Sequence, residues 1–105
     1  MIHEIITANL IDKIFLLIQT QAEFKRESIW YEIQDDWSFI YLRISVETMD
    51  AKKMLALRNI AEFLDSTVPG REDDCSWMVS LILDGETVDT YFGGNLSSPK
   101  MGFHD

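Results

Sequence analysis

Apolar side chains recur along the chain with two periods, one typical of helices and the other typical of strands. Between residues 9 and 26 they are spaced three and four apart, which predicts an amphipathic helix with Asn9 as its N-cap. A second stripe with the same spacing predicts a helix over residues 50–65, with Asp50 as its N-cap.

Two other segments alternate apolar and polar residues, which predicts two hairpins, over residues 28–46 and 75–92. Asp35 and Asp36 fit a tight connection in the first hairpin, and Asp84-Gly85 is a strong signal for a type I′ turn in the second. We also expect a short strand over residues 3–6. Residues 93–105 are expected to form a loop or tail that docks through Met101 and Phe103.

The predicted order is therefore αββαββ, and the simplest architecture is an α+β fold. We expect an antiparallel sheet with both helices packed on one face, in a single domain that spans residues 1–105. The other face of the sheet is expected to be partly hydrated and to carry Trp37, Tyr41, Arg43 and Tyr91.

Acidic residues outnumber basic ones by 18 to 9, which gives a formal net charge of −9. The excess lies in two stretches: residues 28–50 hold five acids against one base, and residues 65–89 hold seven against one. Such segments repel nucleic acids and anionic membranes, which bind to positive patches, and they attract basic proteins. We therefore expect a basic protein partner, with neither a nucleic acid nor a membrane as a partner.

The chain has one cysteine, Cys75, so it cannot form an internal disulfide, which fits a reducing compartment. Asp73 and Asp74 precede Cys75 and should raise its thiol pKa, which disfavours a reactive thiolate. The first residues lack a basic signal-peptide region, and the longest apolar-rich stretch is too short to span a bilayer. We expect a cytoplasmic protein.

Patterns that would support catalysis or a cofactor are missing. His3, His104 and Cys75 are too few and too dispersed in sequence for a typical zinc site, and neither histidine is well placed for a catalytic triad. The sequence has neither a phosphate-binding glycine loop nor EF-hand spacing. We therefore expect a protein that is not an enzyme and that needs no cofactor or metal.

The candidate partner-binding residues are the acids of the two charged stretches and two aromatic anchors that lie beside acids. They are Glu32, Asp35, Asp36, Trp37, Glu72, Asp73, Asp74, Asp84, Glu86, Asp89 and Tyr91.

In its size, its acidic charge and its lack of active-site residues, the whole chain resembles the small bacterial immunity proteins of contact-dependent inhibition and related polymorphic toxin systems. The resemblance implies an antitoxin that blocks the active-site cleft of a toxin domain, in particular a basic nuclease. It also implies that the candidate carboxylates take the place of phosphates in that cleft, while Trp37 and Tyr91 supply desolvated contacts. One alternative is an acidic adaptor or nucleic-acid mimic that regulates a host enzyme, which predicts acids along one continuous ridge. A small enzyme or metal-binding module predicts a cleft with shifted carboxylate pKa values.

Overall fold

The computed structural model describes residues 5–21, 23–97 and 102–103. Its helices are α1 (Ala8–Thr20), a short 3-10 helix η1 (Arg26–Ser28) and α2 (Ala51–Thr67). Its strands are β1 (Ile29–Gln34), β2 (Phe39–Val46), β3 (Trp77–Leu83), β4 (Glu86–Gly93) and β5 (Gly102–Phe103). The predicted αββαββ order is confirmed, with β5 as a short addition.

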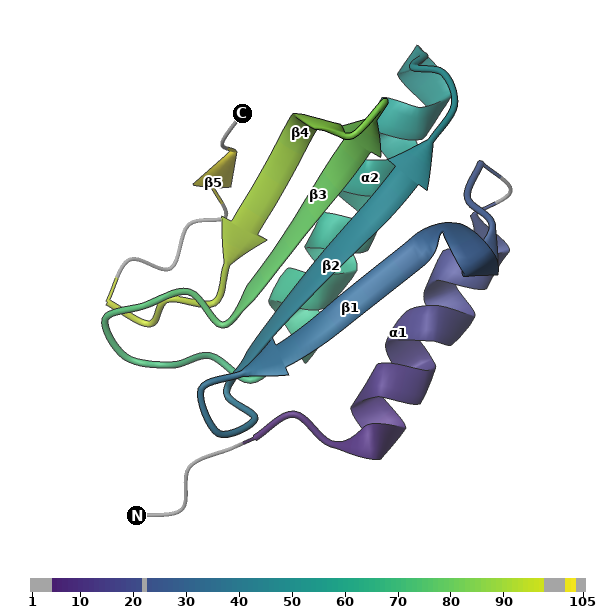
Figure 1. Ribbon diagram of the computed structural model, residues 1–105. Coiled ribbons are helices and arrows are strands. Elements are labelled where there is room, and N and C mark those ends of the chain that lie inside the picture. The colour runs from purple at the N-terminus through teal and green to yellow at the C-terminus, as the bar shows by residue number, and fades with distance from the viewer. Residues whose placement is uncertain (1–4, 22, 98–101, 104–105) are drawn as a thin grey trace.

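The strands form one mixed sheet in the order β1-β2-β3-β4-β5, as Figure 1 shows. The predicted purely antiparallel sheet is wrong, because β2 and β3 pair in parallel while the other neighbouring strands are antiparallel. The connection explains the difference. Helix α2 carries the chain back along the sheet, so β3 starts at the same end as β2, whereas a hairpin would reverse the direction.

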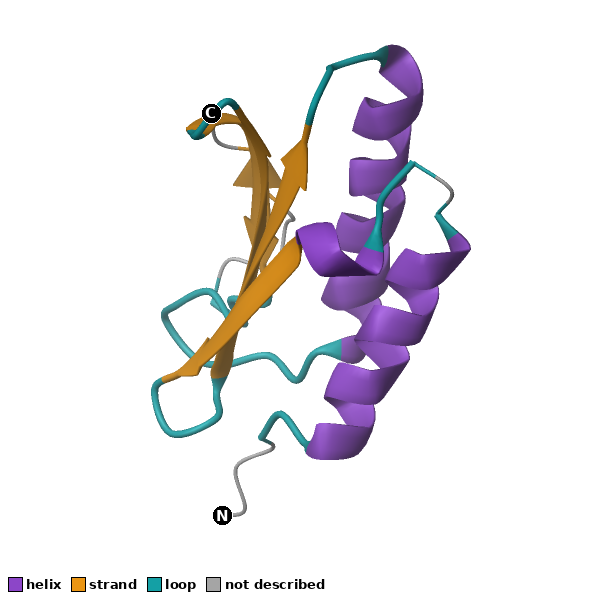
Figure 2. Ribbon diagram, turned by 45° about the vertical axis from the view of Figure 1, so that its right-hand side comes forward, coloured by secondary structure: helices purple, strands orange, loops and turns teal. Residues whose placement is uncertain are grey.

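Both long helices lie on one side of the sheet, as Figure 2 shows. The face of β2 and β3 that meets them is apolar and fully buried, and its residues are Ile40, Leu42, Ile44, Trp77, Val79 and Leu81. From the helices, Ile14, Ile18, Leu57, Ile60 and Leu64 complete the core. Burial of this apolar surface is the main force that holds the two layers together.

Helix α1 begins and ends earlier than predicted. Its N-cap is Thr7, whose hydroxyl accepts a hydrogen bond from the Leu10 amide at 3.2 Å, and the predicted cap Asn9 lies inside the helix. Ile6, before the cap, is 1 % exposed, and Ile11 packs against the core, so both apolar positions of a hydrophobic staple are filled. Of the strand predicted over residues 3–6, only Ile5 and Ile6 are described, and neither lies in a strand.

Helix α2 begins as predicted. The Asp50 carboxylate accepts a hydrogen bond from the Lys53 amide at 2.9 Å, and the Lys53 ammonium lies 3.0 Å from the same carboxylate. The hydrogen bond from the Lys53 amide, followed by that from the Lys53 ammonium, lowers the pKa of Asp50 below its ordinary value of 3.8. The N-cap is therefore a carboxylate that remains charged to lower pH than a free aspartate.

The two hairpin connections differ. Asp84 and Gly85 both have positive φ, at 52° and 80°, and β3 and β4 pair directly on either side of them, which confirms the type I′ turn. The first hairpin has a four-residue loop between Gln34 and Phe39, the last residue pair of β1 and β2. The predicted tight connection at residues 35–36 is thus part of a longer loop.

The chain after β4 pairs again with the sheet. Residues 102–103 form β5 against Phe92 and Tyr91, so the expectation of a loop or tail over residues 93–105 is only partly right. The backbone of Phe103 pairs with Tyr91 in this strand, whereas Met101, the other residue expected to dock, lies outside the described residues.

Candidate functional site

The face of the sheet opposite the helices has no covering layer among the described residues, as Figure 2 shows. The registers bring three rows of side chains onto this open face. The first is Glu32, Tyr41, Met78 and Phe92; the second is Trp30, Arg43, Ser80 and Thr90; the third is Ser45, Ile82 and Thr87. The prediction that Tyr41 and Arg43 lie on this face is confirmed.

Side-chain contacts fix the middle of the open face. The Tyr41 hydroxyl donates to the Ser80 hydroxyl at 3.2 Å, and the Ser80 and Thr90 hydroxyls share a hydrogen bond of 2.8 Å. The Trp30 ring packs edge-on against Tyr41, with ring centroids 5.9 Å apart, and the Arg43 guanidinium lies 5.3 Å from the Trp30 ring centroid. These contacts hold an aromatic and cationic group in place on a surface that is still accessible.

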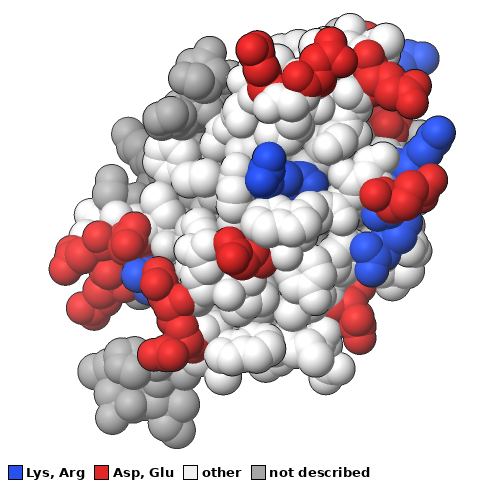
Figure 3. Space-filling model, viewed as in Figure 1, with Lys and Arg blue, Asp and Glu red and all other residues white. Residues whose placement is uncertain are grey.

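Acidic side chains gather at two ends of this face, as Figure 3 shows. Parallel pairing brings together the residues that precede β2 and the residues that precede β3. The first acidic cluster therefore comprises Asp35, Asp36, Glu72, Asp73 and Asp74, all exposed. Charges that are distant in the sequence thus form one negative end of the molecule.

Arg71 joins the two loops of the first acidic cluster. Its guanidinium lies 2.8 Å from the Asp35 carboxylate and 3.3 Å from the Asp74 carboxylate. The Asp73 carboxylate accepts a hydrogen bond from the Ser97 hydroxyl at 2.7 Å. These partly exposed ion pairs add little to folding stability, but they show that the loop before β3 contacts the loop before β2.

The loop between β1 and β2 displays Trp37 within this acidic end. Asp35, Asp36 and Trp37 have φ values of 55°, 55° and 69°, a left-handed conformation that is uncommon for residues with side chains. The Trp37 carbonyl accepts a hydrogen bond from the Ile6 amide at 2.7 Å, and the Trp37 side chain is 52 % exposed. The loop therefore presents an accessible indole next to Asp35 and Asp36 in the chain, as an anchor would require.

The second acidic cluster lies at the other end of the strands. It comprises Glu47 after β2, with Asp84 and Glu86 at the β3–β4 turn, all exposed. Strand β3 has seven residues, and at roughly 3.3 Å per residue the two clusters lie about 20 Å apart. Between them, most side chains over the strands are uncharged (Figure 3).

Two predicted site residues lie on the other face. Asp89 and Tyr91 pair with the buried residues Leu81 and Val79, so they lie on the helix-covered side of β4. Asp89 is 3 % exposed and Tyr91 packs against the core. The prediction that Tyr91 lies on the hydrated face is therefore wrong. A register shift between Leu81 and Ile82 places an extra residue, Val88, in β4. Because of this bulge, the residues of β4 after Val88 face the opposite side from the one that simple alternation predicts.

Cys75 follows the first acidic cluster and is partly buried. Burial raises the pKa of its thiol, and the neighbouring Asp74 carboxylate raises that pKa further. The expected direction of the pKa shift is confirmed, with burial as its larger cause. The thiolate, which is the nucleophilic form, is correspondingly scarce near neutral pH.

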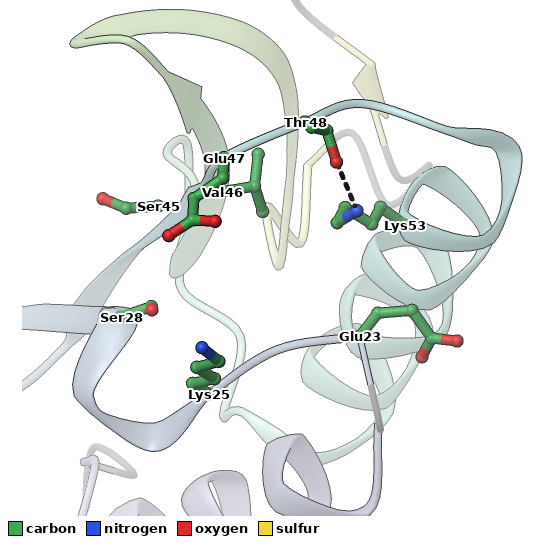
Figure 4. Close-up of a pocket in the computed structure, with 8 residues that line it drawn as sticks. All are labelled: Glu23, Lys25, Ser28, Ser45, Val46, Glu47, Thr48 and Lys53. Carbon is green, nitrogen blue, oxygen red and sulfur yellow. Dashed lines mark hydrogen bonds between the residues drawn. The ribbon is translucent and has the colours of Figure 1, made fainter.

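A small cavity of about 150 Å³ lies beside the end of β2. Figure 4 shows Lys25 and Glu47 directed toward one another, and the Lys53 ammonium bound to the Thr48 hydroxyl at 3.0 Å. The lining contains two lysines and two glutamates, because Glu23 also contributes. Because these charges balance, the cavity favours neither an anionic nor a cationic ligand. The open face is therefore the stronger candidate site.

Within the described ranges, no group of three or more His, Cys, Asp or Glu side chains is arranged to hold a metal ion. Neither α1 nor α2 is long and apolar enough to cross a bilayer, and the same holds for every helix that the structure describes.

Sequence reasoning did not assign a site role to Trp30, Tyr31 or Arg71. The alternation of β1 places Trp30 on the same face as Glu32, so the sequence pattern already indicated that Trp30 lies next to a candidate site residue. The role of Arg71 depends on the parallel pairing of β2 and β3, which the local pattern does not encode.

Comparison with protein-family models, with curated proteins and with solved structures finds no significant match for this chain.

Proposed function

We propose that this chain is an immunity protein that binds a toxin domain and inhibits it by covering its active-site cleft. The proposed partner is a basic nuclease. The observation that carries the proposal is the open sheet face, which has an exposed tryptophan at its edge and acidic clusters at both ends. A basic cleft rimmed by Lys and Arg is complementary in charge to a surface with an acidic cluster at each end.

The two parts of the surface have different roles in this proposal. The acidic clusters attract the partner and raise the association rate, an effect that weakens with salt. Trp30 and Trp37 are 46 % and 52 % exposed, and burial of their rings slows dissociation. Arg43 lies on the same face and pairs with an acid or a backbone carbonyl of the partner.

A nucleic-acid mimic is the alternative within the same charge argument. It calls for carboxylates spaced like phosphates along a continuous ridge. The clusters lie at opposite ends, with a largely uncharged surface between them, and this separation favours a protein partner with a shaped surface over simple phosphate mimicry.

The first test is whether the adjacent upstream gene ends in a cytotoxic domain. If it does, the toxicity of that domain and its affinity for this chain are the readouts. Asp36→Asn with Glu72→Gln removes two exposed charges of the first acidic cluster that are outside the Arg71 ion pairs. Asp12→Asn with Glu62→Gln removes the same charge from exposed positions on α1 and α2 and serves as the control. Glu62 pairs with Arg58, but both side chains are exposed, so loss of this ion pair should change stability little.

We expect the cluster variant to bind about 10-fold more weakly at low salt, mainly through slower association, and the control to change affinity less than about 2-fold. Equal losses in both variants would show that net charge alone is responsible. A chain that neither binds the domain nor protects cells from it would refute the proposal.

A further inference from the structure

The two edges of the sheet are covered differently. At one edge, β4 pairs with β5 through Tyr91 and Phe92. At the other edge, in the part of the chain that the structure describes, β1 pairs with β2 alone. The pairing of β1 is continuous over six residues, from Ile29 opposite Ile44 to Gln34 opposite Phe39. An edge strand of this kind offers a row of backbone donors and acceptors to another strand.

Several of the common devices that block an edge are missing from β1, and its one charged side chain is Glu32. Its sequence, Ile29–Gln34, contains neither lysine nor proline, and its register shows no bulge. Trp30 and Tyr31 point to opposite faces of the strand and are 46 % and 41 % exposed. Phe15 of α1 contacts the Tyr31 ring, with centroids 5.2 Å apart, yet leaves that ring accessible. An added strand would therefore find apolar surface on both of its faces.

The charge of this edge favours one occupant. Residues 27–36 contain Glu27, Glu32, Asp35 and Asp36, and no basic residue. Antiparallel pairing of two copies centred on Glu32 would place two Glu32 carboxylates directly opposite each other, which is destabilising. The register centred on Ile33 avoids this pair, because it places Glu32 opposite Gln34. It still brings together two segments that each hold four acids and no basic residue, which repel each other. A strand with Lys or Arg avoids this repulsion and gains attraction.

We propose that β1 is a docking edge for an extended segment of a partner protein that carries Lys or Arg at alternate positions. The segment adds a strand beside β1 by backbone hydrogen bonds, with its basic side chains over Glu32 and the Asp35–Asp36 loop. The inference rests on the basic partner of the proposed function and adds the mode in which that partner binds.

The test uses a synthetic peptide, acetyl-Lys-Val-Lys-Val-Lys-Val-Lys-amide, as the probe strand. The control peptide has proline in place of each valine, which keeps the charge but removes strand-forming N–H groups. Amide hydrogen exchange of β1 is measured in the intact chain with each peptide. We expect the valine peptide to slow exchange of outward-facing β1 amides about 10-fold and the proline peptide to leave them unchanged.

A substitution separates charge attraction at β1 from general charge attraction. Glu32→Lys should weaken binding of the valine peptide about 10-fold at low salt, whereas Asp84→Asn with Glu86→Gln, at the other end of the sheet, should change it less than about 2-fold. Melting temperatures of the variants confirm that both remain folded.

Equal exchange with the two peptides would overturn strand docking. Protection of β1 that grows with the concentration of the chain alone would also overturn it, in favour of a second copy at this edge. These outcomes are distinct from failure of the proposed function, because the toxin assay with the Asp36 and Glu72 substitutions does not depend on the peptide.

Discussion

The two faces of the sheet are built from the same strands but have opposite surroundings. On β2, Ile40, Leu42 and Ile44 are fully buried beneath the helices, while Arg43 between them is exposed. The exposure of side chains on the open face varies from strand to strand. Ser80 on the central strand β3 is 1 % exposed, whereas Trp30 on the edge strand β1 is 46 % exposed. The comparison teaches that lack of a covering layer does not make a face uniformly accessible.

This gradient locates the surface that a partner can reach. Neighbouring strands shield the central part of the open face, so new contacts concentrate toward β1, β2 and the loop that carries Trp37. The same region adjoins the first acidic cluster. The helix-covered face supplies stability, and in the proposed function the β1 side of the open face supplies recognition.

The largest expected effect comes from the covered face. Leu42→Ala removes a fully buried side chain and should lower the free energy of unfolding by about 2–5 kcal/mol, because the core cannot fully close the cavity. Arg43→Ala, one residue later on the open face, should cost less than about 1 kcal/mol. Urea denaturation of both variants measures the difference, and similar losses would contradict the division between the faces.

A smaller effect should arise from the buried part of the open face. Ser80→Ala removes the hydroxyl that joins Tyr41 to Thr90 and should lower the free energy of unfolding by about 1–2 kcal/mol. Ser45→Ala, at an exposed position of the same face, should stay within about 0.5 kcal/mol of the parent. If the two alanine variants were equally stable by urea denaturation, the hydroxyl chain would have no role in the fold.

Local signals in the sequence predicted much of this architecture. Asp50 begins α2 and Asp84-Gly85 forms the type I′ turn, because side-chain capping and positive φ depend on a few adjacent residues. The cap of α1 was misassigned because Thr7 and Asn9 are both suitable cap residues. Burial of Ile6 immediately before Thr7 favours Thr7, and that burial is a tertiary property.

Nonlocal features could not be predicted in the same way. The pairing of β2 with β3 depends on how α2 packs, and it places Asp35 beside Asp74 through Arg71. The bulge at Val88 does not disturb the alternation of apolar and polar residues in the sequence of β4. It nevertheless turns Asp89 and Tyr91 to the covered face. The sequence therefore identifies the two segments that hold the excess acids. The grouping of those acids in space and the face on which Tyr91 lies could be found only from the structure.

The smallest expected effect concerns the carboxylate that begins the covering helix α2. Asp50 has a lowered pKa in the folded chain, so its charged form stabilises the fold above the unfolded-state pKa, and this contribution is lost as the pH falls through the folded-state pKa. Asp50→Ala should therefore melt below the parent at about pH 6, and the gap should narrow toward about pH 3.

Asp50→Asn provides the control, because an asparagine side chain still accepts the hydrogen bond from the Lys53 amide but carries no charge. It should melt between the parent and the alanine variant at about pH 6, and its gap to Asp50→Ala should vary little with pH. Thermal melts across this range follow both gaps. A gap between parent and Asp50→Ala that stays constant down to about pH 3 would mean that the charge of Asp50 does not help to anchor α2 over the sheet.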